Sequence, residues 1–344
     1  MSQLEPIGGR RITRRALLGG ALTATASALV GLPSFAQQMQ THLPPGVVPK
    51  PKGPLVFLDY DQEEIDAAYT QAPWSPNQAD LVARNIQKSK GVVARLGPAR
   101  RLAYGPTDVE NLDLFTTRRP NAPINIYIHG GAWRAGDAAA EAYQSEMFVD
   151  AGVHFIALDF NNVLETKGNL TTMAEQVRRG VAWVHRNAAS FGGDPNQLYV
   201  SGHSSGAHLA AVILTTDWQK EFGLPIDSVK GGLCVSGIYD LYPVSLSVRS
   251  SYVTFTAPVI EALSPLRHLD RLVAPVIVAH GSLETPEFQR QNREFAAAVK
   301  AAGKPVEFIQ LDGYNHFEVH ESLGNPYGPL GRAVLRQMKV AGTI

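Results

Sequence analysis

A serine in a sharp glycine turn is the residue of this sequence best suited to covalent chemistry. Ser204 stands in Gly202-His203-Ser204-Ser205-Gly206, between a short β-branched and aromatic run and an Ala- and Leu-rich stretch. A strand, a Gly-x-Ser-x-Gly turn and a helix in this order lift the serine hydroxyl clear of a sheet, where it can attack a substrate. We therefore predict that Ser204 is a nucleophile. The alternatives are a plain turn serine, or Ser205 as the nucleophile, although the backbone amide of Ser205 is better placed to stabilise charge.

A base and an acid that could activate this serine follow later in the chain. A serine hydroxyl is a poor nucleophile until a histidine removes its proton, and a carboxylate must hold that histidine in the right tautomer. Glu284 comes just after an apolar run at 276–279, and His316 comes just after another at 306–311. The order Ser, acid, His is the one that accompanies this kind of turn. We predict a triad of Ser204, Glu284 and His316.

Other residues compete for the acid and base roles. Asp240, after the run at 233–236, is an alternative acid, and Glu284 could instead be a solvated loop residue. His320 is the alternative base. His203 and His208 flank the serine, and we expect them to pack or to form hydrogen bonds.

A metal site is the competing chemistry. His316 and His320 are four residues apart with Glu318 between them. The metalloprotease helix needs His-Glu-x-x-His, with the glutamate directly after the first histidine. The spacing here differs, so we predict no bound metal and no cofactor.

A glycine-rich loop at 129–133 is predicted to stabilise a negatively charged oxygen. His129-Gly130-Gly131-Ala132-Trp133 follows the β-branched run at 124–128. Acyl transfer places negative charge on the carbonyl oxygen, which aimed backbone amides can stabilise. We predict the amides of Gly131, Ala132 and Ser205 as donors, the alternative being a plain Gly-Gly turn. The predicted substrate pocket comprises His129, Gly130, Trp133 and Tyr239, with Trp133 either a pocket wall or a packing residue.

Alternating apolar runs and amphipathic stretches must position these residues. The predicted strands lie at 124–128, 153–158, 199–201, 233–236, 276–279 and 306–311, and the predicted helices between them lie at 173–189, 205–215 and 287–302. Continuous apolar strands separated by helices are typical of a mostly parallel sheet covered on both faces, an α/β fold. Residues 55–109 read as polar and helical, with helices at 61–69 and 77–89. We expect one domain over 55–344, with a cap over the site at about 241–269.

Composition excludes several other classes of protein. The chain is 44% hydrophobic and 18% charged, and its formal net charge is zero. These values are typical of a soluble globular protein and leave no basic footprint for nucleic acid. Cys234 is the single cysteine, so no intrachain disulfide can form, and we expect it to be a small core residue.

The N-terminus is predicted to be an export signal. Four arginines precede an apolar run at 16–30, and Ser34-Phe35-Ala36 offers a small-residue cleavage site. Thr13-Arg14-Arg15-Ala16-Leu17-Leu18 resembles a twin-arginine motif. We therefore expect a signal peptide at 1–36, recognition by the twin-arginine export machinery, an extended linker at 37–54 and a periplasmic location without stable membrane association. The alternative is an uncleaved anchor, but the run is short and rich in small residues.

Several motifs together resemble the α/β-hydrolase superfamily, and within it the arylformamidase-like (kynurenine formamidase-like) group and small carboxylesterases. They are His-Gly-Gly-Ala-Trp at 129–133, Phe-Gly-Gly-Asp-Pro at 191–195, Gly-His-Ser-Ser-Gly-Ala-His-Leu at 202–209, Ser-Gly-Ile-Tyr-Asp-Leu at 236–241, Leu-Ser-Pro-Leu at 263–266 and Gly-Ser-Leu-Glu-Thr-Pro-Glu-Phe-Gln-Arg-Gln at 281–291. Bacterial members of the group carry an acid at the position of Glu284. The chain departs from the pattern at Ser205, where relatives often have alanine.

The resemblance implies a serine hydrolase that cleaves a small, aromatic ester, formamide or carbamate through an acyl-enzyme. An N-formylkynurenine formamidase and a non-catalytic binding protein on the same fold are the alternatives. The predicted export signal departs from the cytosolic chemistry of the formamidases. The likeness therefore supports the mechanism better than it supports the substrate.

Overall fold

The computed structural model describes residues 38–340, so the predicted signal peptide at 1–36 lies outside the described residues. Their main feature is an eight-stranded sheet with the order β10-β9-β8-β7-β5-β6-β4-β3. The strands from β6 to β10 in this order pair in parallel, whereas β4 pairs antiparallel with β6 and β3 antiparallel with β4. The strand bounds are β3 Arg100–Ala103, β4 Asn111–Phe115, β5 Ala122–Ile128, β6 His154–Leu158, β7 Gly193–His203, β8 Val229–Val235, β9 Val276–Gly281 and β10 Val306–Leu311.

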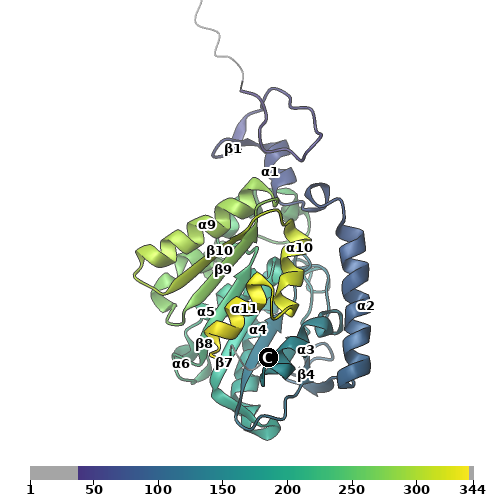
Figure 1. Cartoon of the computed structure of the whole chain (residues 1–344). Coiled ribbons are helices and arrows are strands. Elements are labelled where there is room, and N and C mark those ends of the chain that lie inside the picture. Colours follow the sequence, from purple (N-terminus) through teal and green to yellow (C-terminus); the bar gives the residue numbers. More distant parts are fainter. Residues whose placement is uncertain (1–37, 341–344) are drawn as a thin grey trace, which may run out of the picture. The chain divides into compact units, whose positions relative to one another are not determined.

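Helices cover both faces of this sheet, as the alternation of strands and helices predicts (Figure 1). Successive strand residues point to opposite faces, so Ile126 packs in one core and Tyr127 in the other. The first core holds α4 and α5 with α9, and the second holds α3 and α11. The helix bounds are α1 Gln62–Ala68, α2 Gln78–Leu96, α3 Ser145–Asp150, α4 Leu170–Asn187, α5 Ser205–Leu214, α6 Trp218–Phe222, α7 Leu241–Ser245, α8 Ala257–Leu263, α9 Pro286–Ala301, α10 His316–Glu321 and α11 Pro329–Gln337.

Local sequence explains where the longer helices begin. The side chain of Asn169 caps α4 by accepting from the amides of Thr171 and Thr172. Thr285 caps α9 in the same way, and Pro286 occupies its first position, where a missing N–H costs nothing. In α4, valines three to four residues apart turn one face of the helix to the core.

The stretch at 55–109 differs from its helical prediction. It contains α1 and α2, but also strand β3 and a two-stranded sheet of β1 (Leu55–Phe57) and β2 (Tyr60–Asp61). Strand β3 lies at the edge of the large sheet with most of its side chains exposed, so its sequence carries no apolar alternation. Helix α2 runs past the predicted end at residue 89 to Leu96, and Figure 1 shows it beside α10.

Two further segments, the predicted linker and the predicted cap, lie outside the large sheet. Residues 38–54, in the predicted linker, are mostly irregular but fold against α1, where the carboxylate of Glu64 accepts from the amides of Thr41 and His42. The predicted cap at 241–269 forms α7, α8 and short 3₁₀ turns, among them η4 (Val248–Ser251). Within residues 38–340, no helix is long and apolar enough to cross a membrane.

Candidate active site

Ser204 occupies a strained turn between β7 and α5. Its φ of 58° and ψ of −124° lie where a residue with a side chain is rarely found. Strand β7 ends at His203 and α5 begins at Ser205, as the turn motif predicts. The glycine after the serine allows close packing, because a Cβ atom on Gly206 would lie 2.1 Å from the carbonyl oxygen of Ile128 on β5. The turn is therefore fixed by tight backbone packing, with Ser204 at its apex.

The structure brings Ser204, His316 and Glu284 into one hydrogen-bonded chain. The Oγ of Ser204 lies 3.0 Å from Nε2 of His316, and Nδ1 of His316 lies 3.0 Å from Oε2 of Glu284. All three side chains are buried. Glu284 follows β9 and His316 opens α10 after β10, so the carboxyl ends of three parallel strands supply the three residues. This geometry is that of a serine nucleophile with its base and orienting acid.

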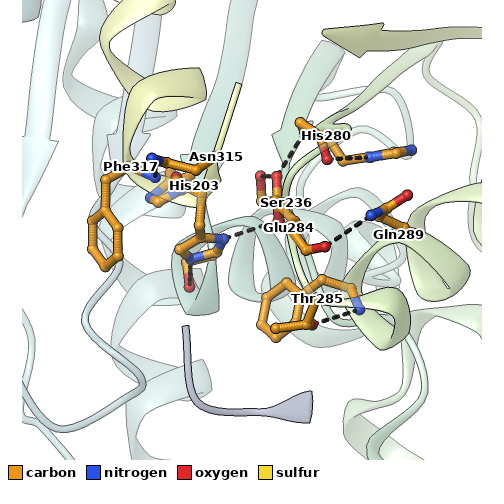
Figure 2. A network of polar contacts seen from close by, with 12 residues as sticks. His203, Ser236, His280, Glu284, Thr285, Gln289, Asn315 and Phe317 are labelled. Carbon is orange, nitrogen blue, oxygen red and sulfur yellow. Dashed lines mark hydrogen bonds and ion pairs between the residues drawn. The ribbon is translucent and has the colours of Figure 1, made fainter. Parts of the chain in front are cut away.

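Glu284 is held by donors on its other oxygen. Its Oε1 accepts from Oγ of Ser236 at 2.6 Å and from the amide of Gly281 at 2.7 Å (Figure 2). Ser236 follows β8, so two neighbouring strands hold the carboxylate. These two donors occupy Oε1 and leave Oε2 for His316.

The backbone around His316 is fixed from two sides. Asn315 caps α10 by accepting from the amides of Phe317 and Glu318. On the other side, the ring of His203 donates from Nε2 to the carbonyl oxygen of His316 at 2.8 Å. Burial, with the neighbouring rings of His320 and His316, holds the pKa of His203 well below its usual value, so His203 is neutral. His203 thus has a structural hydrogen bond, as predicted for this residue.

The alternative acid, Asp240, and the alternative base, His320, interact with groups outside the Ser204 chain of hydrogen bonds. Asp240 caps α7 by accepting from the amide of Tyr242 and pairs with Arg267 at 3.4 Å. Nε2 of His320 contacts the hydroxyls of Tyr127 at 2.5 Å and Tyr143 at 3.0 Å.

His208 is fully engaged between two groups. It donates from Nε2 to the carbonyl oxygen of Leu263 and accepts at Nδ1 from the indole of Trp133. Burial lowers its pKa to about 4. His208 therefore forms hydrogen bonds as a neutral ring, as expected from the sequence.

The glycine loop after β5 presents two amides beside the serine turn. Gly131 and Ala132 both have positive φ, 112° and 55°. Their amides donate to no backbone or side-chain acceptor in the described part of the chain. The next amide, that of Trp133, is already used, because it donates to Oγ of Ser205 at 3.1 Å. Ser205 is the first residue of α5, so its amide has no acceptor within the helix.

The four residues predicted for the substrate pocket lie in different positions relative to the cavity. Gly130 lines the cavity at Ser204, but His129, Trp133 and Tyr239 do not. The ring of His129 stacks on Phe160, that of Tyr239 stacks on Phe295, and Trp133 is a buried packing residue. Their motifs place them beside the site, but their side chains turn into the core.

The cavity at the serine has a volume of about 700 Å³ and is bounded by segments that the sequence analysis did not assign to it. One wall is the first half of α2 with the turn before it, and another is Arg134 with the segment from 248 to 252. Only this short part of the predicted cap reaches the cavity. Val82 and Ile86, two of the apolar side chains of α2 that stay exposed, line this wall.

Among residues 38–340, no group of three or more His, Cys, Asp or Glu side chains is arranged to hold a metal ion.

Solved structures of esterases resemble the whole described fold. A putative thioesterase from a Silicibacter species aligns with a TM-score of 0.68 at 23% identity, covering 78% of this chain and 97% of the other. The carboxylesterase EstE1, from a metagenomic library, aligns with a TM-score of 0.60 at 18% identity, covering 77% and 97%. These likenesses and the strand order show that the protein has the α/β-hydrolase fold.

Sequence relatives then specify the family. The family model BD-FAE matches residues 112–298. Kynurenine formamidase of Danio rerio is 30% identical over 275 residues, covering 76% of this chain and 91% of that protein. Esterase LipQ of Mycobacterium tuberculosis is 30% identical over 251 residues, covering 64% and 59%. The chain belongs to the BD-FAE family, and it is a hydrolase of the esterase and formamidase type.

Proposed function

We propose that this protein is a serine hydrolase that cleaves a small, aromatic ester or amide, such as a formamide or carbamate, through an acyl-enzyme on Ser204. The hydrogen-bonded chain from Ser204 through His316 to Glu284, with 3.0 Å at each step, is the observation that carries the proposal. The cavity above Ser204 gives a substrate access to the hydroxyl.

In the first half of the reaction, the serine is acylated. Nε2 of His316 takes the proton of Ser204 as Oγ attacks the carbonyl carbon, while Glu284 holds the Nδ1–H of the ring. The carbonyl oxygen becomes an oxyanion that the amides of Gly131, Ala132 and Ser205 stabilise. One such donor contributes roughly 3 kcal/mol to the lowering of the barrier. The tetrahedral intermediate then collapses, and His316 gives its proton to the leaving oxygen or nitrogen.

The second half reverses these roles with water as the nucleophile. His316 removes a proton from a water molecule, whose oxygen attacks the acyl carbon. The same amides stabilise the second oxyanion. Collapse releases the carboxylic acid, and the proton on His316 returns to Oγ of Ser204.

The apolar side chains in the walls of the cavity favour a substrate with an aromatic ring. Val82 and Ile86 are 45% and 43% exposed and line the cavity together with Phe317 and Tyr252. An aromatic ring buries a large apolar area and packs well against such side chains. The Danio rerio relative is a formamidase and the Mycobacterium tuberculosis relative an esterase, so both bond types belong in the test.

A matched panel of aryl acetates, formanilides and aryl carbamates tests this proposal. We expect turnover of at least one class by the purified chain, with kcat reduced by about a thousandfold or more in Ser204→Ala. Preference for the formanilide would favour a formamidase, and preference for the acetate a carboxylesterase. Turnover by Ser204→Ala at a rate close to that of the unchanged protein would rule the proposed nucleophile out.

We propose in addition that the protein is exported to the periplasm by the twin-arginine pathway. The motif at 13–18 and the small residues at 34–36 support this, together with a single cysteine. Replacing Arg14 and Arg15 by lysine keeps the charge but removes the arginine pair, so the hydrolase should remain in the cytoplasmic fraction. An equal periplasmic amount of the variant and the unchanged protein would contradict this route.

A further inference from the structure

A buried arginine lines the cavity without a carboxylate partner. Arg249 lies in the 3₁₀ turn η4 and is 4% exposed. Its Nε and Nη2 donate to the carbonyl oxygen of Tyr69 at 3.2 and 3.0 Å, whereas Nη1 is buried and donates to no acceptor among residues 38–340. None of the described carboxylates lies within ion-pair distance of its guanidinium. Burying a charge without a partner lowers the free energy of unfolding, so the burial of Arg249 indicates that its charge has a function.

The groups around Arg249 are aromatic rings, which can stabilise a cation without forming an ion pair with it. Its guanidinium lies 5.2 Å from the ring centre of Trp133, 5.6 Å from that of Tyr69 and 5.9 Å from that of Phe288. Aromatic faces stabilise a guanidinium without neutralising it. Burial, with the positive charge of Arg134, lowers the pKa of Arg249 from its usual value. An arginine nevertheless stays protonated at neutral pH.

Two acidic groups, one in contact with Tyr69 and one in the cavity lining, are engaged elsewhere. Glu287 accepts from the hydroxyl of Tyr69 but is paired with Arg290 at 2.6 Å. Glu141, which also lines the cavity, pairs with His320 at 3.3 Å. The positive charge of Arg249 is therefore open to an anion from outside the chain.

A second polar group without a partner in the described chain lines the same cavity as this arginine. Gln71 follows Tyr69 by two residues and lines the same cavity. Both its Nε2 and its Oε1 are buried, and neither has a hydrogen-bond partner in the described chain. Buried side-chain amides are nearly always hydrogen-bonded in native proteins. Two groups with unused donors line one cavity, and one of them is charged, which indicates a ligand rather than a packing accident.

We propose that Arg249 and Gln71 form a subsite for a carboxylate carried by the substrate. This inference rests on the proposed hydrolase function and narrows its substrate class to aromatic esters or amides that are anionic. The guanidinium supplies a charge-assisted hydrogen bond from Nη1, and the amide nitrogen of Gln71 supplies a second donor. The apolar wall at Val82 and Ile86 holds the ring, and the scissile carbonyl lies at Ser204.

Matched substrate pairs test the subsite. One pair places the charge on the leaving group, 4-acetoxybenzoate against 4-acetoxybenzamide. The other places it on the acyl group, the mono-4-nitrophenyl ester of glutaric acid against 4-nitrophenyl pentanoate. The quantity measured is the ratio of kcat/KM between the charged and the neutral member. We expect the unchanged protein to favour the charged member of at least one pair by roughly tenfold or more.

Three variants and one control variant identify the side chains that bind the carboxylate of the substrate. In Arg249→Met this ratio should fall at least tenfold, mainly through KM, and Arg249→Lys should restore part of it. Gln71→Leu should lower the ratio by roughly threefold to tenfold. Arg134→Met is the matched control, because Arg134 lines the same cavity but is exposed and lies over the ring of Tyr252. In Arg134→Met, the ratio of kcat/KM between the charged and the neutral substrate should change by less than about threefold.

The ratio separates binding from folding, since a loss of folded protein lowers both rates equally. An unchanged ratio in Arg249→Met would overturn the subsite and leave Arg249 a structural anchor for Tyr69. Preference of the unchanged protein for the neutral members would overturn it as well, while leaving the proposed hydrolase intact. Turnover of the acetate, formanilide or carbamate panel without turnover of any charged member would overturn the subsite alone. If neither the pairs nor the panel were turned over, the proposed function itself would fail.

Discussion

Glu284 accepts three hydrogen bonds in a buried position, and each donor comes from a different part of the site. Ser236 and the amide of Gly281 hold one oxygen, which leaves the other to orient the ring of His316. This arrangement fixes which ring nitrogen carries the proton. The nitrogen that faces Ser204 must be unprotonated before it can act as a base.

Replacing Glu284 by glutamine should therefore abolish most turnover while preserving the fold. The glutamine Oε1 can still accept from Ser236 and Gly281, but its NH₂ group would face Nδ1 of His316 and favour the wrong tautomer. We expect kcat to fall by roughly a thousandfold to ten-thousandfold with little change in KM. Steady-state kinetics on an aryl ester measure this.

Asp240→Asn is the matched control for this acid, because asparagine can also cap α7. We expect its kcat to stay within about twofold of the unchanged protein. A large loss in Asp240→Asn together with a small loss in Glu284→Gln would transfer the acid role to Asp240.

At the scale of elements, helix α5 connects the serine turn to the glycine loop and to the end of α8. Its first residue, Ser205, accepts from the amide of Trp133, and one turn later His208 accepts from the Trp133 indole. His208 also donates to Leu263, the last residue of α8. The position of α5 thus fixes both Ser204 and the glycine loop that holds Trp133.

This connection predicts a pH dependence of stability. His208 is neutral in the folded state because burial lowers its pKa to about 4, whereas the unfolded chain has the ordinary value of about 6.5. Between these values the unfolded state binds the proton and the folded state does not. The stability due to neutral His208 is complete above about pH 6.5 and is lost as the pH falls toward about 4.

Denaturant unfolding of the unchanged protein and of His208→Gln would measure this contribution. The glutamine keeps a donor for Leu263 but does not titrate. Between about pH 7.5 and pH 5, the unchanged protein should lose about 2 kcal/mol more unfolding free energy than the variant. Parallel pH profiles for the two proteins would show that His208 does not titrate with the predicted shift.

The position of helix α2 at the cavity could not be predicted from the sequence. Its pattern predicted a helix, but its role as a cavity wall depends on contacts with residues more than two hundred positions away. Asn77, just before α2, donates to Glu318, and Arg84 pairs with Glu321, both on α10. Helix α2 is therefore fastened to the helix that begins with His316. The spacing of apolar and polar residues within α2 does not show that this helix contacts α10.

For the whole molecule, the parallel strands and the serine turn could be predicted because they depend on local patterns. Continuous apolar runs predict buried parallel strands, and a glycine turn between strand and helix predicts the place of Ser204. Strand β3 was missed because an exposed edge strand has no apolar face to reveal it. Tyr239 was misplaced because an aromatic residue next to a site motif can equally turn into the core.

The cavity walls were the hardest part to predict from sequence. Arg249 lies in a Ser-rich stretch that reads as an ordinary loop, and only its burial beside Tyr69 marks it. Such residues are recruited by tertiary packing, so neither periodicity nor motif identifies them. The side chains gathered around Ser204 could thus be predicted better than the walls of the cavity.

Covalent labelling with an aryl phosphonate tests the nucleophilic role of Ser204 most directly. Such a probe reacts with an activated serine and mimics the tetrahedral intermediate that the Gly131 and Ala132 amides would stabilise. We predict one adduct per chain, found by mass spectrometry on the peptide that contains Ser204, with parallel loss of ester hydrolysis and no adduct in Ser204→Ala. Hydrolysis that continues while Ser204 is fully labelled, or an adduct on another residue that stops turnover, would contradict Ser204 as the nucleophile.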